Sequence, residues 1–221
     1  MRDGVRELHV DGTFASCFEP GRDITGSVWD ALAAGITALP RRRRRSVLLL
    51  GLGGGSAARV ARALAPRAEI VGVEIDPSVV RLARRWFELD ALGIEVVVDD
   101  ARAYLGRCRR RFDAVLEDVF IGTGREAVKP EWLPRPGLEG AARCLARRGI
   151  LASNALDEAP AVAAAMARLF PSVVRIQVDD YDNQIFVGCS GTLTGRELRR
   201  AVAATPVLTP TLPRLSFRRL S

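Results

Sequence analysis

The sequence SVLLLGLGGGSAARV, residues 46–60, decides the fold class. A run of aliphatic residues ends in glycines, and a helical pattern begins directly after them. Glycines at the end of a strand let backbone N–H groups approach a ligand where a side chain would collide. The following helix turns its positive N-terminal end toward that ligand. The glycines Gly51, Gly53 and Gly55 have the spacing G-x-G-x-G, with Ser56 where a dinucleotide-binding motif has its third glycine. The loop therefore suits a group smaller than a pyrophosphate; a tight turn without a ligand is the alternative.

Apolar runs and amphipathic stretches alternate around this loop. The runs at 46–50, 68–74, 94–98, 112–117 and 149–154 predict strands that are buried on both faces. Between two of them, Val79, Leu82, Ala83 and Trp86 form the predicted apolar stripe of a helix over 77–89. Strand–helix alternation of this kind predicts a parallel α/β sheet.

The flanking segments predict further elements. Two runs, 172–178 and 184–188, are separated by a short polar joint, which predicts a hairpin and an antiparallel edge on the parallel sheet. A last helix is expected in the stretch 195–204. Before the alternation begins, LHVDGTFAS (8–16) predicts a small hairpin that turns at Asp11 and Gly12.

Acidic residues follow three of the predicted strands. Glu74 ends the second strand at about the distance from Gly51 where a carboxylate takes two ribose hydroxyls. Asp99 and Asp100 end the third strand, and Asp118 ends the fourth. Ligands of open α/β sheets bind beyond the carboxyl ends of the strands. Any one of these acids can equally be a helix cap, but together they predict a nucleoside site.

Composition limits the class of protein. The 221 residues are 48% hydrophobic and contain no apolar run near the ~18 residues of a membrane helix. Without an apolar leader segment, we expect a cytoplasmic protein that does not bind membranes. One histidine and four scattered cysteines predict no metal site.

The chain is basic, with a net charge of +7 and a single lysine, Lys129, among its 33 basic residues. The run RRRRR (41–45) is interpreted as a solvated connector near a helix C-terminus, with nucleic-acid binding as the secondary alternative. A homodimer is the default expectation for the oligomeric state.

Four segments together resemble a known family. VLLLGLGGGSAARVAR, VGVEIDPSVVRLARRWF, VVVDDARAYL and FDAVLEDVF are similar, in order and spacing, to the core motifs of spermidine synthase-like proteins. That group belongs to the class I S-adenosylmethionine-dependent methyltransferase fold. The resemblance implies a Rossmann-like, mostly parallel seven-stranded sheet, an antiparallel C-terminal hairpin strand and a short N-terminal β-hairpin. It divides the chain into a leader hairpin (1–26), a cofactor-binding domain (27–190) and a C-terminal helix and tail (191–221).

The resemblance also implies roles for individual residues. Gly51, Gly53 and Gly55 would contact the amino-acid or aminopropyl arm of the sulfonium cofactor. The ribose would be held by Glu74 with Ile75 beside it, and the adenine edge by Asp100 with Ala101. Asp118 would face the reacting centre as the catalytic residue. The segment 119–136 would cover the pocket as a lid with Trp132 as an aromatic wall.

Three departures from the family pattern concern the polyamine site. Gly54 replaces an aspartate that binds the ammonium of decarboxylated S-adenosylmethionine, and Ala15 replaces a glutamine of the leader hairpin. Ile121 replaces the second acid of a D-x-x-D motif. A diamine dication needs paired acids to offset its desolvation. The loss of the acid at Gly54 is expected to open room for the methionine carboxylate.

The leading hypothesis is therefore an S-adenosylmethionine-dependent transferase that methylates a small-molecule acceptor. The first alternative is aminopropyl transfer from decarboxylated S-adenosylmethionine to an amine. The second is a non-catalytic module that binds a nucleoside or a nucleic acid. A dehydrogenase using NAD is disfavoured by Ser56 and by the lack of a suitable histidine or tyrosine–lysine pair.

Overall fold

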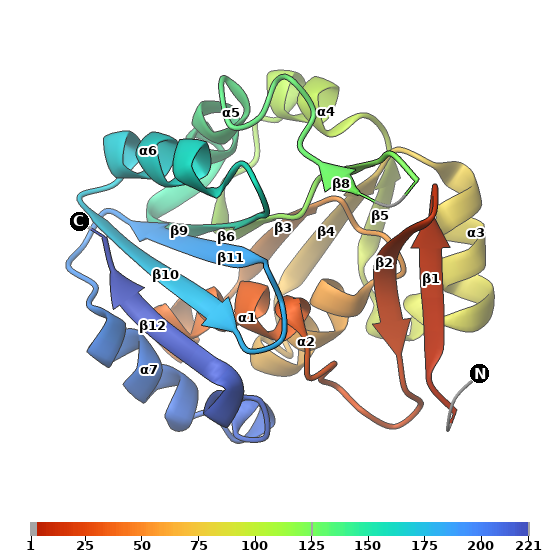
Figure 1. Cartoon of the computed structure of the whole chain (residues 1–221), viewed down its shortest axis with the longest axis horizontal. Helices are drawn as coiled ribbons and strands as arrows, with labels where there is room; N and C mark the ends of the chain where they lie inside the picture. Colours follow the sequence, from red (N-terminus) through yellow and green to blue (C-terminus); the bar gives the residue numbers. More distant parts are fainter. Residues whose placement is uncertain (1–3, 125, 221) are drawn as a thin grey trace.

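The computed structural model describes residues 4–124 and 126–220. Within them, an eight-stranded sheet is covered by helices on both faces (Figure 1). The strands of this sheet are β3 (Ser46–Leu50), β4 (Glu69–Glu74), β5 (Glu95–Val98), β6 (Phe112–Glu117), β9 (Leu145–Ala155), β10 (Ser172–Val178), β11 (Gln184–Cys189) and β12 (Leu215–Arg219). The helices are α1 (Val28–Ala34), α2 (Ser56–Leu64), α3 (Pro77–Trp86), α4 (Ala101–Arg107), α5 (Gly137–Arg143), α6 (Ala159–Leu169) and α7 (Gly195–Ala203). Two small antiparallel pairs lie outside the sheet: β1 (Arg6–Val10) with β2 (Thr13–Phe18), and β7 (Ile121–Gly122) with β8 (Ala127–Val128). Of the helices in these ranges, none combines the length and the apolar character that crossing a bilayer requires.

The strand order confirms the predicted α/β class, with antiparallel C-terminal strands beside the parallel ones. The order is β12-β10-β11-β9-β6-β3-β4-β5, and the five strands from β9 to β5 are parallel. The predicted antiparallel hairpin forms from β10 and β11. On its other side β11 pairs with β9, so this hairpin continues the parallel strands as an antiparallel part of the sheet.

The C-terminal tail adds an eighth strand that the sequence pattern did not predict. β12 pairs antiparallel with β10, with Leu215 opposite Val178. Helix α7, which precedes it, begins with a capping box in which Thr194 and Glu197 satisfy each other's backbone N–H groups. The described part of segment 191–221 is therefore joined to the central sheet. Pro206, Pro210 and Pro213 all lie before β12, and this interrupted stretch concealed the short strand that follows it.

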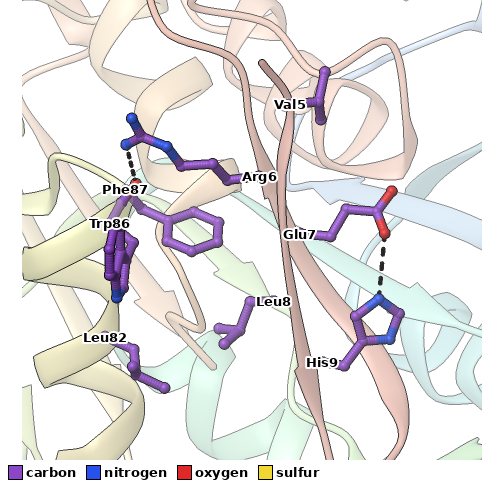
Figure 2. Close-up of a pocket in the computed structure, with 8 residues that line it drawn as sticks. All are labelled: Val5, Arg6, Glu7, Leu8, His9, Leu82, Trp86 and Phe87. Carbon is purple, nitrogen blue, oxygen red and sulfur yellow. Dashed lines mark hydrogen bonds and ion pairs between the residues drawn. The ribbon is translucent and has the colours of Figure 1, made fainter. Parts of the chain in front are cut away.

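The N-terminal hairpin forms as predicted, and it alters the surface of α3. Asp11 and Gly12 both have positive φ, as a tight hairpin turn requires. The hairpin packs Leu8 against Val79 and Phe87. Leu82 and Trp86, predicted to lie in the buried stripe of α3, are instead 43% and 46% exposed. They flank a hollow of about 790 Å³ between α3 and β1 (Figure 2).

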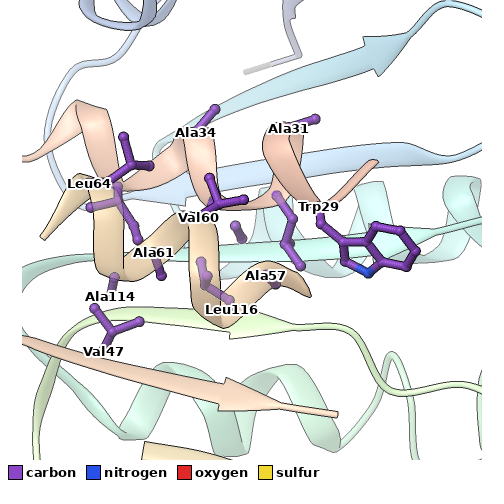
Figure 3. Packing of buried hydrophobic residues seen from close by; sticks show 14 of the residues in the cluster. Trp29, Ala31, Ala34, Val47, Ala57, Val60, Ala61, Leu64, Ala114 and Leu116 are labelled. Atoms are coloured by element: carbon purple, nitrogen blue, oxygen red, sulfur yellow. The ribbon is translucent and has the colours of Figure 1, made fainter. Parts of the chain in front are cut away.

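The core is formed on both faces of the sheet by a two-residue alternation. In β3, Val47 and Leu49 belong to the layer under α1 and α2, whereas Leu48 and Leu50 belong to the layer under α4 to α6. Small side chains such as Ala31, Ala34 and Ala61 occupy the region where α1 and α2 meet over β3 and β6 (Figure 3). This packing keeps the carboxyl ends of the parallel strands at one edge of a rigid sheet.

Candidate functional site

A cavity of about 810 Å³ lies at the carboxyl edge of the sheet. Its walls come from the residues that follow β3, β4, β5 and β6, and from the start of α1. The leader hairpin and the segment 119–136, named the roof here, complete the enclosure. The predicted site residues at the strand ends are therefore brought together, with the exception of Gly55.

The glycine loop is shaped by close contacts with its neighbours. Gly51, Gly53 and Gly55 have φ values of +79°, +54° and +90°, which favour glycine. A Cβ at Gly51 would lie 2.4 Å from the carbonyl oxygen of Asp118. Gly51 and Gly53 line the cavity. Gly55 lies outside it, because it caps α2 and a Cβ there would meet Leu89. The expected contact of Gly55 with a cofactor is thus not supported by its position.

The leader hairpin is bonded directly to this loop. The Gly54 N–H donates to Ser16 Oγ at 2.7 Å. Ser56 Oγ accepts from the Cys17 N–H and donates to the Cys17 carbonyl. Ser56, which breaks the dinucleotide-binding pattern, thus joins strand β2 to the start of α2.

The acid at the end of β4 is oriented by two backbone groups. Glu74 accepts from the Gly53 N–H at 2.8 Å and from the Asp76 N–H at 3.1 Å, one on each oxygen. A carboxylate has about four lone-pair sites, so each oxygen keeps capacity toward the cavity. The side chain of Ile75 lies next to it, 64% exposed.

The acids after β5 have structural partners as well as cavity positions. Asp100 is the N-cap of α4 and accepts from the Ala103 N–H at 2.9 Å. Asp99 pairs with Arg107. Asp100 and Ala101 both line the cavity, and Ala101 is the first residue of α4. The start of this helix therefore forms part of the cavity wall, and its first backbone N–H groups have no partner within the helix.

Asp118 is held at the end of β6 by two neutral donors. Trp29 Nε1 donates to Oδ2 at 3.0 Å, and Asn154 Nδ2 donates to Oδ1 at 2.8 Å. Burial raises the pKa of the Asp118 carboxyl above its ordinary value, although the hydrogen bond from Asn154 and the charge of Lys129 oppose this shift. Asp118 is thus a desolvated carboxylate on the wall of a cavity, which is a common property of proton acceptors.

Sequence reasoning did not identify Trp29, Asn154 or Asn183, which all line the cavity. Asn154 lies near the carboxyl end of β9, at the edge where the acids of the other strands were found. The strand-end argument, extended from acids to amides, would have identified it. Trp29 carried no separate signal because it belongs to an amphipathic stretch that packing explains.

The roof is anchored by a buried ion pair. Lys129 Nζ lies 2.7 Å from Glu117 Oε1, and both side chains are fully buried. Lys129 also donates to the Val119 carbonyl, and Ser153 Oγ donates to the other Glu117 oxygen. Between β7 and β8 the roof meets the leader hairpin, where the Gly124 N–H donates to the Asp11 carbonyl. Trp132 of the roof lines the cavity, as expected for a cover.

Comparisons with known proteins relate this sequence to transferases. A family model described as "Methyltransferase domain" matches residues 47–149. The chain is 31% identical over 170 residues to the eEF1A lysine and N-terminal methyltransferase homolog of Drosophila melanogaster, covering 72% of this chain and 25% of that protein. It is 32% identical over 125 residues to the polyamine aminopropyltransferase of Vibrio vulnificus, covering 55% of this chain and 40% of that protein.

A solved structure extends the likeness to almost the whole chain. The probable spermidine synthase from Corynebacterium glutamicum superposes with a TM-score of 0.77 at 22% identity, over 97% of this chain and 83% of that one. This chain is a spermidine synthase-like protein of the class I methyltransferase fold. It spans between a quarter and two fifths of the length of the two curated relatives described above.

The departures of this spermidine synthase-like chain can now be placed in the structure. A Cβ at Gly54 would lie 2.8 Å from Ser16 Cβ and 3.0 Å from a ring carbon of Phe87. The expectation that the lost acid opens room is therefore wrong, because the leader hairpin and Phe87 fill that space. Ile121, in place of a second acid, is 48% exposed on β7 and lines the cavity with Ala15.

Proposed function

We propose that the chain binds S-adenosylmethionine in the cavity at the strand ends and transfers its methyl group to an amine nitrogen of a small-molecule acceptor. The observation that carries this proposal is the composition of the cavity at Asp118. A desolvated carboxylate there shares the wall with the aromatic rings of Phe14, Trp29, Phe120, Trp132 and Tyr181. Carboxylates and aromatic faces both stabilise cations, here an ammonium or a sulfonium.

The residues around Glu74 fit the nucleoside part of the cofactor. Each Glu74 oxygen has one backbone donor and keeps capacity for one ribose hydroxyl. The exposed side chain of Ile75 offers an apolar surface to a purine ring, and the N-terminal turn at Ala101 offers backbone donors to its edge. Glu74 and Asp118 follow strands on either side of β3, so a ligand lying across Gly51 would reach both.

Asp118 would prepare the acceptor. When bound, the cofactor supplies a methyl group activated by the positive sulfur. An ammonium acceptor must first lose a proton so that its nitrogen lone pair can attack the methyl carbon. Asp118, whose pKa is raised by burial, is the residue that takes this proton. The roof and the leader hairpin would exclude water and orient the nitrogen in line with the carbon–sulfur bond.

Two positions favour methyl over aminopropyl transfer. Residue 54 is a glycine packed against Ser16, so no acid stands there to bind the ammonium of a decarboxylated cofactor. Ile121 provides no second carboxylate for a diamine. Of the two curated relatives described above, the one that covers more of this chain is named as an eEF1A lysine and N-terminal methyltransferase homolog, and both of those groups are amines.

Aminopropyl transfer is a second candidate because of one residue. Glu131, on the roof, lines the same cavity as Asp118. Its carboxylate is a source of the second negative charge that Ile121 lacks. The named polyamine aminopropyltransferase among the relatives supports the same alternative.

Binding and transfer assays separate these candidates. Isothermal titration with S-adenosylmethionine, S-adenosylhomocysteine and decarboxylated S-adenosylmethionine measures which cofactor binds. We expect the first two to bind and the third to bind at least tenfold more weakly. Methyl transfer from radiolabelled S-adenosylmethionine to a panel of primary and secondary amines then tests the reaction. Failure of both S-adenosylmethionine and S-adenosylhomocysteine to bind would refute the proposal, and turnover with decarboxylated S-adenosylmethionine and putrescine would replace it.

A further inference from the structure

The environment of Asp118 contains a chain of three polar side chains. Asp118 Oδ1 accepts from Asn154 Nδ2 at 2.8 Å, and Asn154 Oδ1 accepts from Asn183 Nδ2 at 2.9 Å. Asn154 lies near the end of β9, whereas Asn183 lies in the joint between β10 and β11. The end of β9 and the joint between β10 and β11 are therefore connected to the carboxylate that follows β6.

The direction of these hydrogen bonds is determined by chemistry. A side-chain amide has donors on its nitrogen and acceptors only on its oxygen. Because Asn183 donates to Asn154 Oδ1, the Asn154 nitrogen must face Asp118. If the Asn154 amide turned over, its oxygen would face the carboxylate, and its nitrogen would face the donor of Asn183. In this arrangement the Asn183 donor and the acceptor-only Asp118 carboxylate therefore hold the Asn154 amide in the same orientation from its two ends.

The charged groups near Asp118 have opposing effects on its pKa. Lys129 favours the carboxylate form and Glu117 opposes it, but these two residues form an ion pair with each other. Glu131 and Tyr181 line the same cavity. The second neutral donor, Trp29 Nε1, binds the other oxygen. Among the interactions with the described residues, the hydrogen bond from Asn154 is the largest influence that offsets burial, followed by the charge of Lys129.

We infer that Asn183, acting through Asn154, is a positioning residue that holds the Asp118 carboxylate in one orientation and ready to accept a proton. The hydrogen bonds among Asn183, Asn154 and Asp118 are seen in the structure whatever the reaction is. That Asp118 accepts its proton from an amine rests on the proposed function. The chain makes the joint between β10 and β11 part of the site, although the joint contributes no charge to it through Asn183.

Asn183→Asp is the sharpest test, because an aspartate at 183 accepts but does not donate. Asn154 would then turn its nitrogen toward residue 183 and its oxygen toward Asp118. Asp118 would form a hydrogen bond with that oxygen only when protonated. Carbon-13 NMR of the aspartate carboxyl groups, with Asp118 assigned through Asp118→Asn, measures the titration midpoint. We expect it to rise by more than one pH unit in Asn183→Asp and by about one unit in Asn154→Leu.

Two controls separate orientation from charge. Asp182→Asn changes the charge by one at an exposed neighbouring position, outside the chain, and sets the size of a pure charge effect. Asn183→Ala removes the orienting donor without adding charge, and we expect a rise smaller than in Asn183→Asp. An Asp118 midpoint that moves no more in Asn183→Asp than in Asp182→Asn, or that stays unchanged in Asn154→Leu, overturns the inference.

A kinetic measurement connects this result to the reaction. In Asn183→Asp we expect a kcat at least tenfold lower, an acid limb of the pH–rate profile moved to higher pH, and an unchanged Kd for S-adenosylmethionine. Shifted NMR midpoints in a protein that transfers no methyl group would refute the proposed function alone. Active enzyme with unshifted midpoints would refute the positioning role alone.

Discussion

At the scale of single residues, the burial of Asp118 both suits it to accept a proton and lowers the stability of the folded protein. Asp118 is desolvated, and its two hydrogen-bond donors are neutral. Burying a carboxylate without an adjacent unpaired cation disfavours its charged form. The raised pKa that suits a proton acceptor must therefore reduce the stability of the folded protein at neutral pH.

This cost gives a signed prediction. The folded-state pKa of Asp118 lies above its ordinary value of 3.8, so the folded protein holds this proton more tightly than the unfolded chain. Its contribution to stability then falls as the pH rises from about 4 to the folded pKa, and is constant above it. In urea unfolding between pH 4 and 8, Asp118→Asn should gain stability relative to the unmodified protein across that window. If the difference in unfolding free energy between Asp118→Asn and the unmodified protein stays constant or shrinks as the pH rises, the pKa of Asp118 is not raised.

Glu74 gives a prediction for binding. Its two oxygens are oriented by the Gly53 and Asp76 N–H groups toward a diol. Glu74→Gln replaces one acceptor with a donor, so we expect the Kd for S-adenosylmethionine to rise about 10- to 100-fold and the ligand-induced rise in Tm to disappear. Asp118→Asn is the matched control and should keep most of that rise. Equal losses in the two variants would argue against separate roles.

At the scale of elements, the loops around the site are fixed by contacts that leave little freedom. The turn after β3 approaches the end of β6 so closely that Gly51 has no room for a side chain. The roof depends on one buried ion pair, Glu117 with Lys129. Breaking a buried pair leaves an uncompensated charge, which costs more than the pair itself contributes.

Lys129→Met should therefore be strongly destabilising. It leaves Glu117 buried and unpaired, and we expect a loss of about 3–5 kcal/mol in the free energy of unfolding. The double variant Glu117→Gln with Lys129→Met removes both charges and should recover part of the loss. Urea denaturation of the two single variants and the double variant measures the coupling. Additive effects would mean that the pair does not hold the roof.

Gly51→Ala tests the turn after β3. The new Cβ would lie 2.4 Å from a backbone oxygen of Asp118, at a φ of +79°. We expect a lower Tm together with weaker cofactor binding, because the end of β6 must move. Gly106→Ala is the matched control: it lies in α4 with open space around it, and alanine there should stabilise by about 0.5–1 kcal/mol.

The sequence predicted these elements unevenly, for physical reasons. Strands buried on both faces are continuous apolar runs, so β3, β4 and β6 and the acids that follow them could be located. The hydrogen bond from Gly54 to Ser16 joins positions 38 residues apart and leaves no periodic signal. The exposure of Leu82 could not be predicted either. The apolar stripe of α3 does not indicate which part of the helix the leader hairpin covers.

At the scale of the whole molecule, the segment that leads into α1 meets the segment that leads into β12. Asp30 is fully buried and accepts from the Thr25 and Gly26 N–H groups. Thr211, which precedes β12, donates its hydroxyl to the same carboxylate. Arg214 donates to the Gly26 carbonyl. The tail therefore secures the segment that leads from the leader hairpin into α1, and with it Trp29.

Thr211→Val tests this connection. The substitution keeps the shape of the side chain but removes the donor to a buried carboxylate, so we expect a loss of about 1–3 kcal/mol in unfolding free energy. The coupling to the site appears in tryptophan fluorescence, because Trp29 lies next to Asp30 in α1. Thr209→Val, at an exposed position in the same segment, is the control and should change neither quantity.

The burial of Lys129 has a consequence for how movement of the roof can be observed. It is the one lysine in a chain with 33 basic residues, and its side chain has no exposed surface. An acetylating reagent can therefore modify this ammonium only in molecules whose roof has opened. The rate at which mass spectrometry detects acetyl-Lys129 therefore reports how often the roof opens, without an added probe. A ligand that closes the cavity should lower this rate.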